Sequence, residues 1–139
     1  MTEIDFYVLA DADESNRERL ACRLAEKAFG LGHRIYLNAR DAQQARALDD
    51  LLWTFRDGAF LPHALLADDA TAPIVIGAGE EPAATPDLMI NLAGTAPAFF
   101  TRFDRIAELV NEEPAVRDAG RERFRFYRDR GYSLRTHKL

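Results

Sequence analysis

The chain has 139 residues, of which 47% are hydrophobic and 29% charged, and its formal net charge is -5 at pH 7. This length suits one domain, and this composition is typical of a globular protein rather than a disordered one. No apolar run approaches the ~20 residues of a membrane-spanning helix, and the acidic net charge argues against broad, non-specific binding to nucleic-acid phosphates.

The first half of the chain begins with a predicted strand and a predicted helix. Residues 4–10 form a β-prone run. The helix that follows has an apolar face, and Gly30 and Gly32 mark its end, because glycine readily adopts the left-handed conformation of a helix stop. That apolar face carries Leu20, Leu24 and Ala28. Candidate N-caps for the helix are Asp11, Asp13 and Ser15.

A second strand and a second helix repeat this order. Residues 34–39 are β-prone, and Asp41 can cap the helix that comes next. The apolar face of this helix carries Ala45, Leu48, Leu52 and Phe55. Strands and helices that alternate through short links imply a parallel sheet with right-handed crossovers.

The second half of the chain is less regular. Residues 54–72 form a long connection, after which residues 73–76 and 87–92 are predicted as a third and a fourth strand. Residues 98–110 are compatible with a helix or a strand, and we favour a short turn followed by an edge strand near 103–110. Pro114 suits the first turn of a last helix, which should run to about Gly131.

Together these elements predict the fold class. We expect an α/β protein with three layers, α/β/α, in which a mainly parallel sheet of about five strands has helices on both faces. The sequence contains no internal repeat and no linker, so residues 1–139 are predicted to form one domain.

Signals of enzymatic chemistry are weak. Gly77 and Gly79 follow a strand, but a dinucleotide-binding fingerprint needs a third glycine at a helix start, and a P-loop needs Gly-Lys-Ser/Thr. The acids within residues 11–14 would cap a helix as readily as they would hold Mg²⁺. Cys22 has no recognisable partner base and is predicted to be a packed thiol. A small nucleotide- or flavin-binding enzyme on the parallel sheet is therefore only an alternative.

Cysteine usage and the first residues favour a cytoplasmic protein. Cys22 is the single cysteine, so an internal disulfide is excluded, and no cysteine–histidine cluster has the spacing of metal ligands. Glu3 and Asp5 stand where a secretory signal would carry lysine or arginine. We expect a cytoplasmic protein with no membrane segment, no metal and no cofactor.

Two segments have the composition of binding surfaces. Residues 51–63 place a tryptophan, two phenylalanines and three leucines around a loop. Part of this segment must be core, but exposed aromatic loops are where binding hot spots concentrate, and Trp53 and Phe60 are the better candidates.

The second segment is basic. Residues 117–139 hold eight of the 18 lysines and arginines but only three of the 23 acids. Arg117, Arg121, Arg125 and Arg128 fall on one face of the predicted last helix, with Phe124 beside them and Val116, Gly120 and Tyr127 at the edge. Because arginine forks suit carboxylates, this stripe favours an acidic peptide with a hydrophobic end. Direct binding of single-stranded nucleic acid is a further alternative.

The same segments carry a resemblance to a known family. The opening Asp-Phe-Tyr-Val-Leu at 5–9, Leu52-Trp53 followed by the Phe-Leu-Pro-His at 60–63, and the strands at 73–76 and 87–92 resemble the chi subunit family of bacterial DNA polymerase III. The end of the chain from Arg121 to Leu139 is similar to that family's C-terminal signature. The resemblance covers nearly the whole chain, in order.

This resemblance implies an α/β/α domain without catalytic activity that joins two proteins. It implies binding to the psi subunit, which links chi to the clamp loader, through a surface of Trp53, Phe60, Leu61 and Pro62. It also implies binding to the acidic C-terminal tail of single-stranded DNA-binding protein, which ends in phenylalanine. Contact with DNA would be only indirect.

The tail site that the resemblance implies lies on the last helix. It would use Arg121, with Phe124 and Arg125 one turn further on, and the rest of the basic stripe with its edge: Arg117, Tyr127 and Arg128. Phe124 stands where the family commonly has tyrosine, and Arg125 stands where it commonly has lysine.

Overall fold

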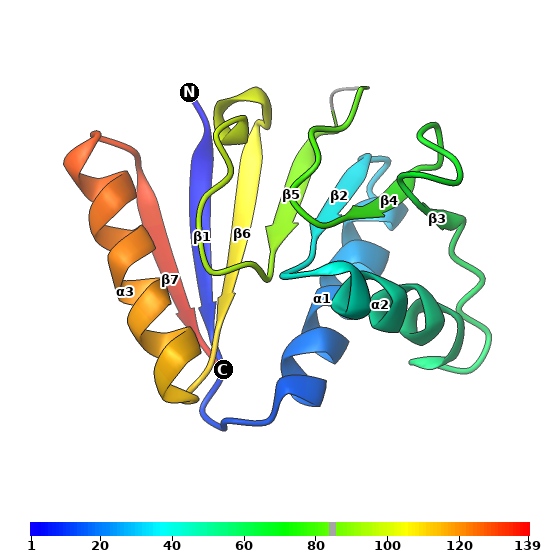
Figure 1. Cartoon of the computed structure of the whole chain (residues 1–139), viewed down its shortest axis with the longest axis horizontal. Helices are drawn as coiled ribbons and strands as arrows, with labels where there is room; N and C mark the ends of the chain where they lie inside the picture. Colours follow the sequence, from blue (N-terminus) through cyan, green and yellow to red (C-terminus); the bar gives the residue numbers. More distant parts are fainter. Residues whose placement is uncertain (84–85) are drawn as a thin grey trace.

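Seven strands form one sheet within residues 1–83 and 86–139, the part of the chain that the computed structural model describes (Figure 1). Their order is β3-β4-β2-β5-β6-β1-β7, and every pairing between neighbours is parallel. The predicted α/β fold is confirmed, with seven strands rather than about five. The strands are β1 (Glu3–Val8), β2 (Ile35–Asn38), β3 (His63–Leu65), β4 (Ile74–Gly77), β5 (Leu88–Asn91), β6 (Arg105–Val110) and β7 (Leu134–Lys138).

Helices cover both faces of the sheet, as predicted. The chain moves from β1 to β2 to β3 in one direction along the sheet, so right-handed crossovers put α1 (Glu14–Gly30) and α2 (Ala42–Thr54) on the same face. The later connections run in the opposite direction and put the 3₁₀ turn η1 (Phe100–Arg102) and α3 (Pro114–Asp129) on the other face. None of the helices in the described residues combines the length and the apolar character needed to cross a bilayer.

The helix ends follow their local sequence. Asp13 caps α1 by accepting from the Ser15 N–H at 2.9 Å, and Asp41 caps α2 by accepting from the Gln44 N–H at 2.8 Å. Pro114 opens α3, where its missing N–H costs nothing. Gly32, just past the end of α1, has a φ of 87°, the conformation that favours glycine. All four roles were predicted.

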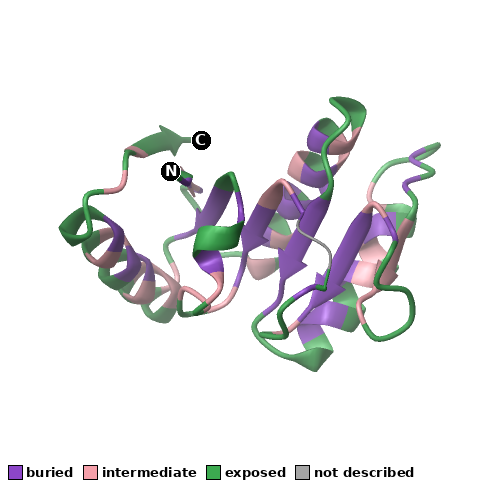
Figure 2. Ribbon diagram, turned by 90° about the horizontal axis from the view of Figure 1, so that it is seen from above, coloured by how far each residue is buried: buried purple, intermediate pink, exposed green. Residues whose placement is uncertain are grey.

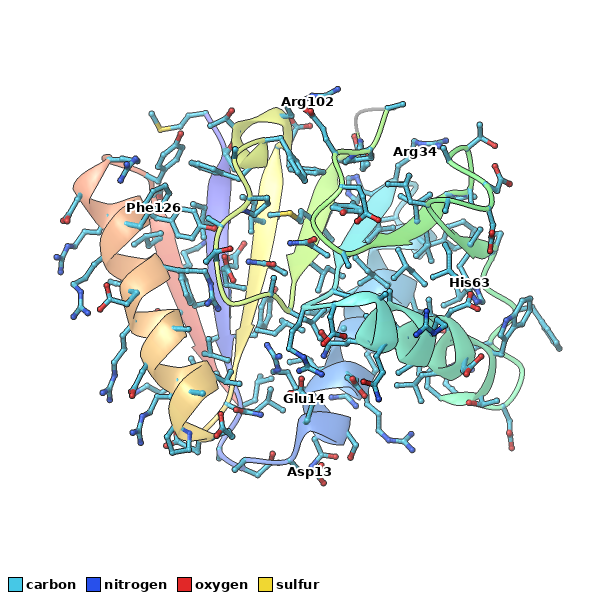
Figure 3. The ribbon with its side chains drawn as sticks, in the orientation of Figure 1. Asp13, Glu14, Arg34, His63, Arg102 and Phe126 are labelled. Carbon is cyan, nitrogen blue, oxygen red and sulfur yellow. The ribbon has the colours of Figure 1, made fainter. Side chains whose placement is uncertain are left out.

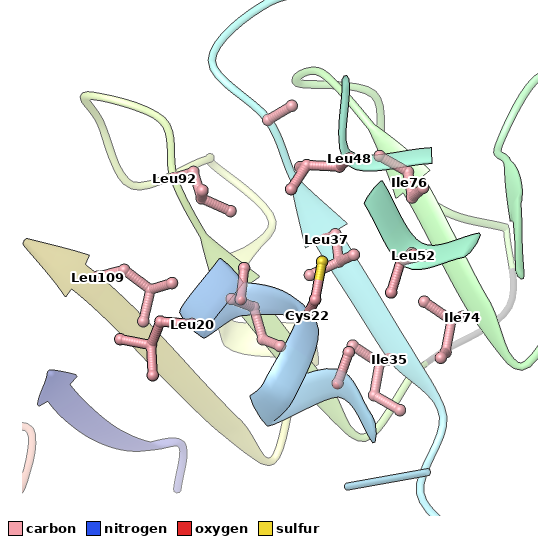
Figure 4. Close-up of a cluster of buried hydrophobic side chains, with 14 of the residues drawn as sticks. Leu20, Cys22, Ile35, Leu37, Leu48, Leu52, Ile74, Ile76, Leu92 and Leu109 are labelled. Atoms are coloured by element: carbon pink, nitrogen blue, oxygen red, sulfur yellow. The ribbon is translucent and has the colours of Figure 1, made fainter. Parts of the chain in front are cut away.

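Two hydrophobic clusters hold the layers together, one on each face of the sheet. Strands buried on both faces, such as β4, read as continuous apolar runs, which is typical of parallel sheets. The cluster opposite α1 and α2 is aromatic and includes Phe6, Tyr36, Phe100, Phe103 and Tyr127. The cluster under α1 and α2 is aliphatic (Figure 4) and includes Leu20, Cys22, Ile35, Leu37, Leu48, Leu52, Ile74 and Ile76.

Cys22 is a packed thiol, as predicted. It is fully buried between α1 and the sheet (Figure 4). Burial raises the pKa of its thiol to about 12, so it stays protonated at neutral pH and is a poor nucleophile.

The two edge strands differ from expectation. β3 lies inside the predicted connection 54–72, and β7 lies in a stretch for which no strand was predicted. β6 is a strand, as favoured for 103–110, but it lies between β5 and β1 rather than at an edge. Most of β7 is exposed (Figure 2) and carries polar side chains, so it lacks the apolar alternation that marks a half-buried strand.

Candidate docking surfaces

The four arginines of the predicted stripe share the outer face of α3. Their side chains range from 38% exposed at Arg117 to 66% at Arg121. Four acids compensate part of this charge, because Glu112, Asp118, Glu122 and Asp129 each lie within ion-pair distance of one or two of the arginines. Exposed ion pairs of this kind contribute little free energy, so a partner carboxylate can compete for the guanidinium groups.

A cavity of about 270 Å³ opens beside Arg117 and Arg121. It lies between α3 and strands β1, β6 and β7, and Thr136 and Glu112 contribute polar atoms to its rim. Its apolar lining comes from Phe6, Val8, Val110 and Phe124. The cavity thus joins an apolar floor to two cationic side chains, the combination that an acidic peptide with a hydrophobic end requires.

Gly120 explains why α3 approaches the sheet closely at this point. A Cβ atom at Gly120 would lie 2.5 Å from Cγ1 of Val110, closer than real Cβ atoms come to other atoms. Glycine is unfavourable inside a helix by about 1 kcal/mol relative to alanine, so its presence in the middle of α3 indicates a packing requirement. Gly120 was expected at the edge of the arginine stripe, but its contact with Val110 was not predicted.

A buried polar cluster lies under the same helix. The Glu108 carboxylate of β6 accepts from Arg123 Nε at 2.8 Å, from the Tyr127 hydroxyl at 2.6 Å and from Asn91 Nδ2 at 3.0 Å. Tyr127 is fully buried, so the structure corrects its expected place among the residues that contact the tail. Arg123 is only 4% exposed and belongs to the same cluster.

Asn111 lines the cavity at the start of α3 and was not predicted as a site residue. It is 1% exposed, and its Oδ1 accepts from the Glu113 N–H at 3.1 Å. Its Nδ2 has no hydrogen-bond partner, and in the described part of the chain it is the one buried side-chain nitrogen or oxygen of which this is true.

The second predicted surface lies at the opposite edge of the sheet. Trp53 is 59% exposed and Phe60 86% exposed, which are high values for aromatic side chains. Pro62 is also exposed, but Leu61 is only 6% exposed and packs in the aliphatic cluster, so the expected Leu61 contact is corrected.

Contacts from β3 fix the position of Trp53. The Trp53 ring lies 4.5 Å from the ring of His63, the first residue of β3. Figure 3 labels His63. The imidazole of His63 lies 2.7 Å from the Leu61 carbonyl and 3.1 Å from the Asp49 carbonyl. The Trp53 side chain is therefore held against His63 in the free protein, which reduces the conformational entropy that this side chain loses when a partner binds.

The carboxyl edge of the sheet is where a nucleotide enzyme would bind its ligand. A cavity of about 410 Å³ lies there between β2 and β5, but nearby backbone donors are already satisfied. The Gly79 N–H donates to Asn38 Oδ1, and the Gln44 N–H at the start of α2 donates to Asp41. Glu80 accepts from the Ala78 N–H. Carboxylates at these positions would repel a phosphate.

The carboxylates in the turn before α1 also have hydrogen-bond partners within the protein. Asp13 caps the helix, and Asp11 accepts from the Asp13 N–H and from Asn16. Burial raises the pKa of the Glu14 carboxyl, but hydrogen bonds from Arg17 and Arg40 outweigh burial and hold that pKa below its ordinary value (Figure 3 labels Asp13 and Glu14). Across residues 1–83 and 86–139, no group of three histidine, cysteine, aspartate or glutamate side chains is arranged to hold a metal ion.

Comparison with known proteins gives matches along the whole chain. The model of the family described as DNA polymerase III chi subunit, HolC, matches residues 1–135. The chain is 52% identical over 139 residues to the DNA polymerase III subunit chi of Pseudomonas aeruginosa, covering 100% of this chain and 98% of that protein. It is 30% identical to the subunit of the same name from Escherichia coli, covering 98% and 97% of the two chains.

A solved structure shares the fold without close sequence similarity. A crystal structure of T4 UvsW superimposes with a TM-score of 0.67 at 13% identity. The match covers 99% of this chain but only 42% of that one. At this level of identity the likeness concerns the arrangement of strands and helices alone.

Proposed function

The chain belongs to the DNA polymerase III chi subunit family, and from that premise we propose that it is a non-catalytic adaptor between two protein partners. A member of this family is a subunit of DNA polymerase III and serves DNA replication. In our proposal one partner is the psi subunit of the clamp loader, and the other is the C-terminal tail of single-stranded DNA-binding protein.

The cavity beside Arg117 and Arg121 is the observation that supports tail binding. Its apolar lining, with Phe6 and Phe124 at a ring-centroid distance of 5.3 Å, offers an aromatic wall to a terminal phenylalanine. The exposed guanidinium groups beside it suit the acidic residues that precede that phenylalanine. Arg125 and Arg128 extend the positive face along α3, away from the cavity lining.

The Trp53–Phe60 surface, made of Trp53, Phe60 and Pro62, supports the contact with psi. Large exposed aromatic side chains are unusual on a monomer and are enriched at binding hot spots. Trp53 and Phe60 are the exposed large hydrophobic side chains near β3. The other exposed large hydrophobic side chains in the described residues are Met1, Leu31 and Leu139.

We propose one domain over residues 1–139, a cytoplasmic location, no cofactor, and contact with DNA only through the protein partners. The net charge of -5 disfavours direct binding of phosphates.

The test of the tail site is the Arg121→Ala variant, titrated with a peptide that has the acidic tail sequence and ends in phenylalanine. Loss of a charge-assisted contact should cost ~1.5–3 kcal/mol, which is roughly ten- to a hundredfold in affinity. Isothermal titration calorimetry at fixed salt measures the change. Arg46→Ala, which removes an exposed arginine from α2, is the control and should bind as the wild type does.

Two outcomes would contradict the proposal. Equal losses for Arg121→Ala and Arg46→Ala would indicate a diffuse charge effect rather than a site. Tight binding of a single-stranded DNA oligonucleotide that Arg121→Ala also weakens would favour the direct nucleic-acid alternative.

A further inference from the structure

β7 lies at an edge of the sheet and is paired with β1 along its inner side. At one end of this pairing the Ile4 N–H donates to the Ser133 carbonyl at 3.3 Å. At the other end the Leu139 N–H donates to the Val8 carbonyl at 2.9 Å. Successive residues of a strand point their backbone groups to opposite sides, so every second residue from 133 to 139 faces β1.

The residues between them face the open edge of β7. By this alternation Leu134, Thr136 and Lys138 direct their N–H and C=O groups away from β1. Most of the strand is exposed (Figure 2). An open edge of this kind is a template on which an extended peptide can add as a further strand, through main-chain hydrogen bonds.

This open edge is continuous with the cavity beside Arg117 and Arg121. The side chain of Thr136 helps to line the cavity, while its backbone groups lie on the open edge. Side chains alternate between the two faces of a sheet, so Lys138 projects to the same face as Thr136. A peptide whose apolar end occupied the cavity could therefore leave it past Thr136 and reach the free backbone groups of β7.

The charge of β7 favours an acidic strand over a second copy of this chain. β7 contains Arg135, His137 and Lys138 and no acidic residue. Two copies paired through β7 would bring these basic side chains together, and like charges on neighbouring strands destabilise the pairing. The acids of a peptide would instead meet Lys138 at the edge and Arg121 at the cavity.

We propose that the residues preceding the apolar end of a bound acidic peptide add to β7 as a further strand, through the backbone groups of Leu134, Thr136 and Lys138. This inference rests on the proposed tail binding and gives it a binding mode. Affinity then depends on main-chain donors of the peptide as well as on its charge.

The first test uses the wild-type protein and peptides of one acidic sequence with a terminal phenylalanine, each carrying a single main-chain N-methyl group at a different position. In an added strand every second N–H faces β7. Methylation at those positions should weaken binding about three- to tenfold, and methylation at the intervening positions by less than about twofold. Calorimetric titration measures the affinities, and the two sets of peptides control for each other because their charges are equal.

Hydrogen exchange measured by NMR locates the contact on the protein. Saturating unmethylated peptide should slow exchange of the Thr136 and Lys138 amides by at least about tenfold, because both gain an acceptor. The Leu65 amide is the matched control at the other edge of the sheet. The Leu66 N–H donates to the Ile76 carbonyl, so the Leu65 N–H faces the open side of β3 and its exchange should not change.

A pair of variants at Lys138 separates the backbone from the charge. Lys138→Gln removes the charge and keeps the open N–H. Lys138→Pro removes both, and proline is compatible with an edge strand where its nitrogen faces solvent. Lys138→Pro should therefore bind the unmethylated peptide at least about threefold more weakly than Lys138→Gln does. Circular dichroism melts verify that both variants fold.

The possible results separate this inference from the proposed function. If the wild type does not bind the unmethylated peptide, the proposed tail binding is wrong and the added strand is wrong with it. If that peptide binds but methylation shows no alternation and the Thr136 and Lys138 amides exchange as before, β7 has no part in recognition while tail binding stands. Slowed exchange that depends on protein concentration without peptide would assign the edge to a second copy instead.

Discussion

At the scale of single residues, the Glu108 carboxylate is the central polar group under α3. It is fully buried on β6 and accepts from side chains of β5 and α3, so three elements meet at one charge. A buried ion pair contributes little by itself relative to apolar packing, but removing one partner leaves the other charge unpaired.

Replacing Arg123 should therefore destabilise the protein strongly. Arg123→Ala would leave Glu108 without its cation, and we expect the free energy of unfolding to fall by about 3–5 kcal/mol. Urea denaturation followed by circular dichroism measures it. Arg125→Ala, on the exposed side of the same helix, is the control and should change stability by less than about 0.5 kcal/mol. Equal stabilities for the two variants would show that the cluster is not structural.

Tyr127 should make stability depend on pH in the alkaline range. Burial, with the neighbouring Glu108 charge, raises the pKa of the Tyr127 hydroxyl well above its ordinary value. Above about pH 10 the unfolded tyrosine loses its proton while the folded one keeps it, so stability falls by ~1.4 kcal/mol per pH unit for this group. Below about pH 10 the hydroxyl is protonated in both states, so its contribution is fully present.

The Tyr127→Phe variant isolates this effect. It loses the hydrogen bond to Glu108 and should be less stable than the wild type by about 1–3 kcal/mol at about pH 8. Between about pH 10 and 11 its stability should decline less steeply, because one titrating group is gone. Urea denaturation across this pH range tests both statements, and parallel declines in the two proteins would contradict the assignment.

At the scale of elements, the contact of α3 with β6 depends on Gly120. Alanine normally stabilises the interior of a helix relative to glycine by about 1 kcal/mol. Here the added methyl group would overlap Val110, so Gly120→Ala should instead destabilise the protein by about 1–3 kcal/mol.

A double-mutant cycle with Val110→Ala checks this contact. Shortening Val110 makes room for the new methyl group, so the double variant should be more stable than the sum of the two single losses implies. Strictly additive losses would mean that the helix and the strand are not in contact at this point. Gly120 and Val110 also line the cavity, so Gly120→Ala should weaken tail binding in addition.

Elements defined by local chemistry could be predicted from the sequence, and elements defined by distant partners could not. The caps at Asp13 and Asp41 act within one turn of the chain, so their residues suffice to locate helix starts. β7 is polar and mostly exposed, and it is a strand because β1 offers it a free edge. No periodicity within residues 134–138 carries that information.

The candidate sites divide in the same way. Helical spacing predicted that Arg117, Arg121, Arg125 and Arg128 share a face, and they do. Spacing does not say which flanking residues turn inward, so Tyr127 was expected at the surface. Arg123 is buried because its guanidinium donates to the Glu108 carboxylate, 15 positions earlier in the sequence. A single sequence does not show which residues pair in this way.

At the scale of the whole molecule, the two proposed surfaces lie at opposite ends of the sheet. The Trp53–Phe60 surface adjoins β3, α3 lies near β7, and these two strands are the two edges (Figure 1). Two partners bound there would not overlap, which suits an adaptor.

We therefore predict that the two binding events are independent. The affinity for the tail peptide should change by less than about twofold when psi is bound at saturation. Phe60→Ala should weaken psi binding but leave tail binding and the melting temperature unchanged, because its ring is 86% exposed. Arg121→Ala should have the converse effect. Calorimetric titrations of the tail peptide, with and without psi, measure the coupling, and a large coupling would contradict separate surfaces.

The pairing of β1 also has a consequence for how the chain is made. β1 precedes the other strands of the sheet in the sequence, yet its two neighbours are β6 and β7, the last two strands in that order. Residues 3–8 must therefore wait for residues 105–110 before they gain a hydrogen-bonded neighbour, and contacts between such distant segments slow folding. During synthesis the apolar face of β1 stays unprotected until β6 has been made, so β1 gains its neighbour only after β2 to β5 exist.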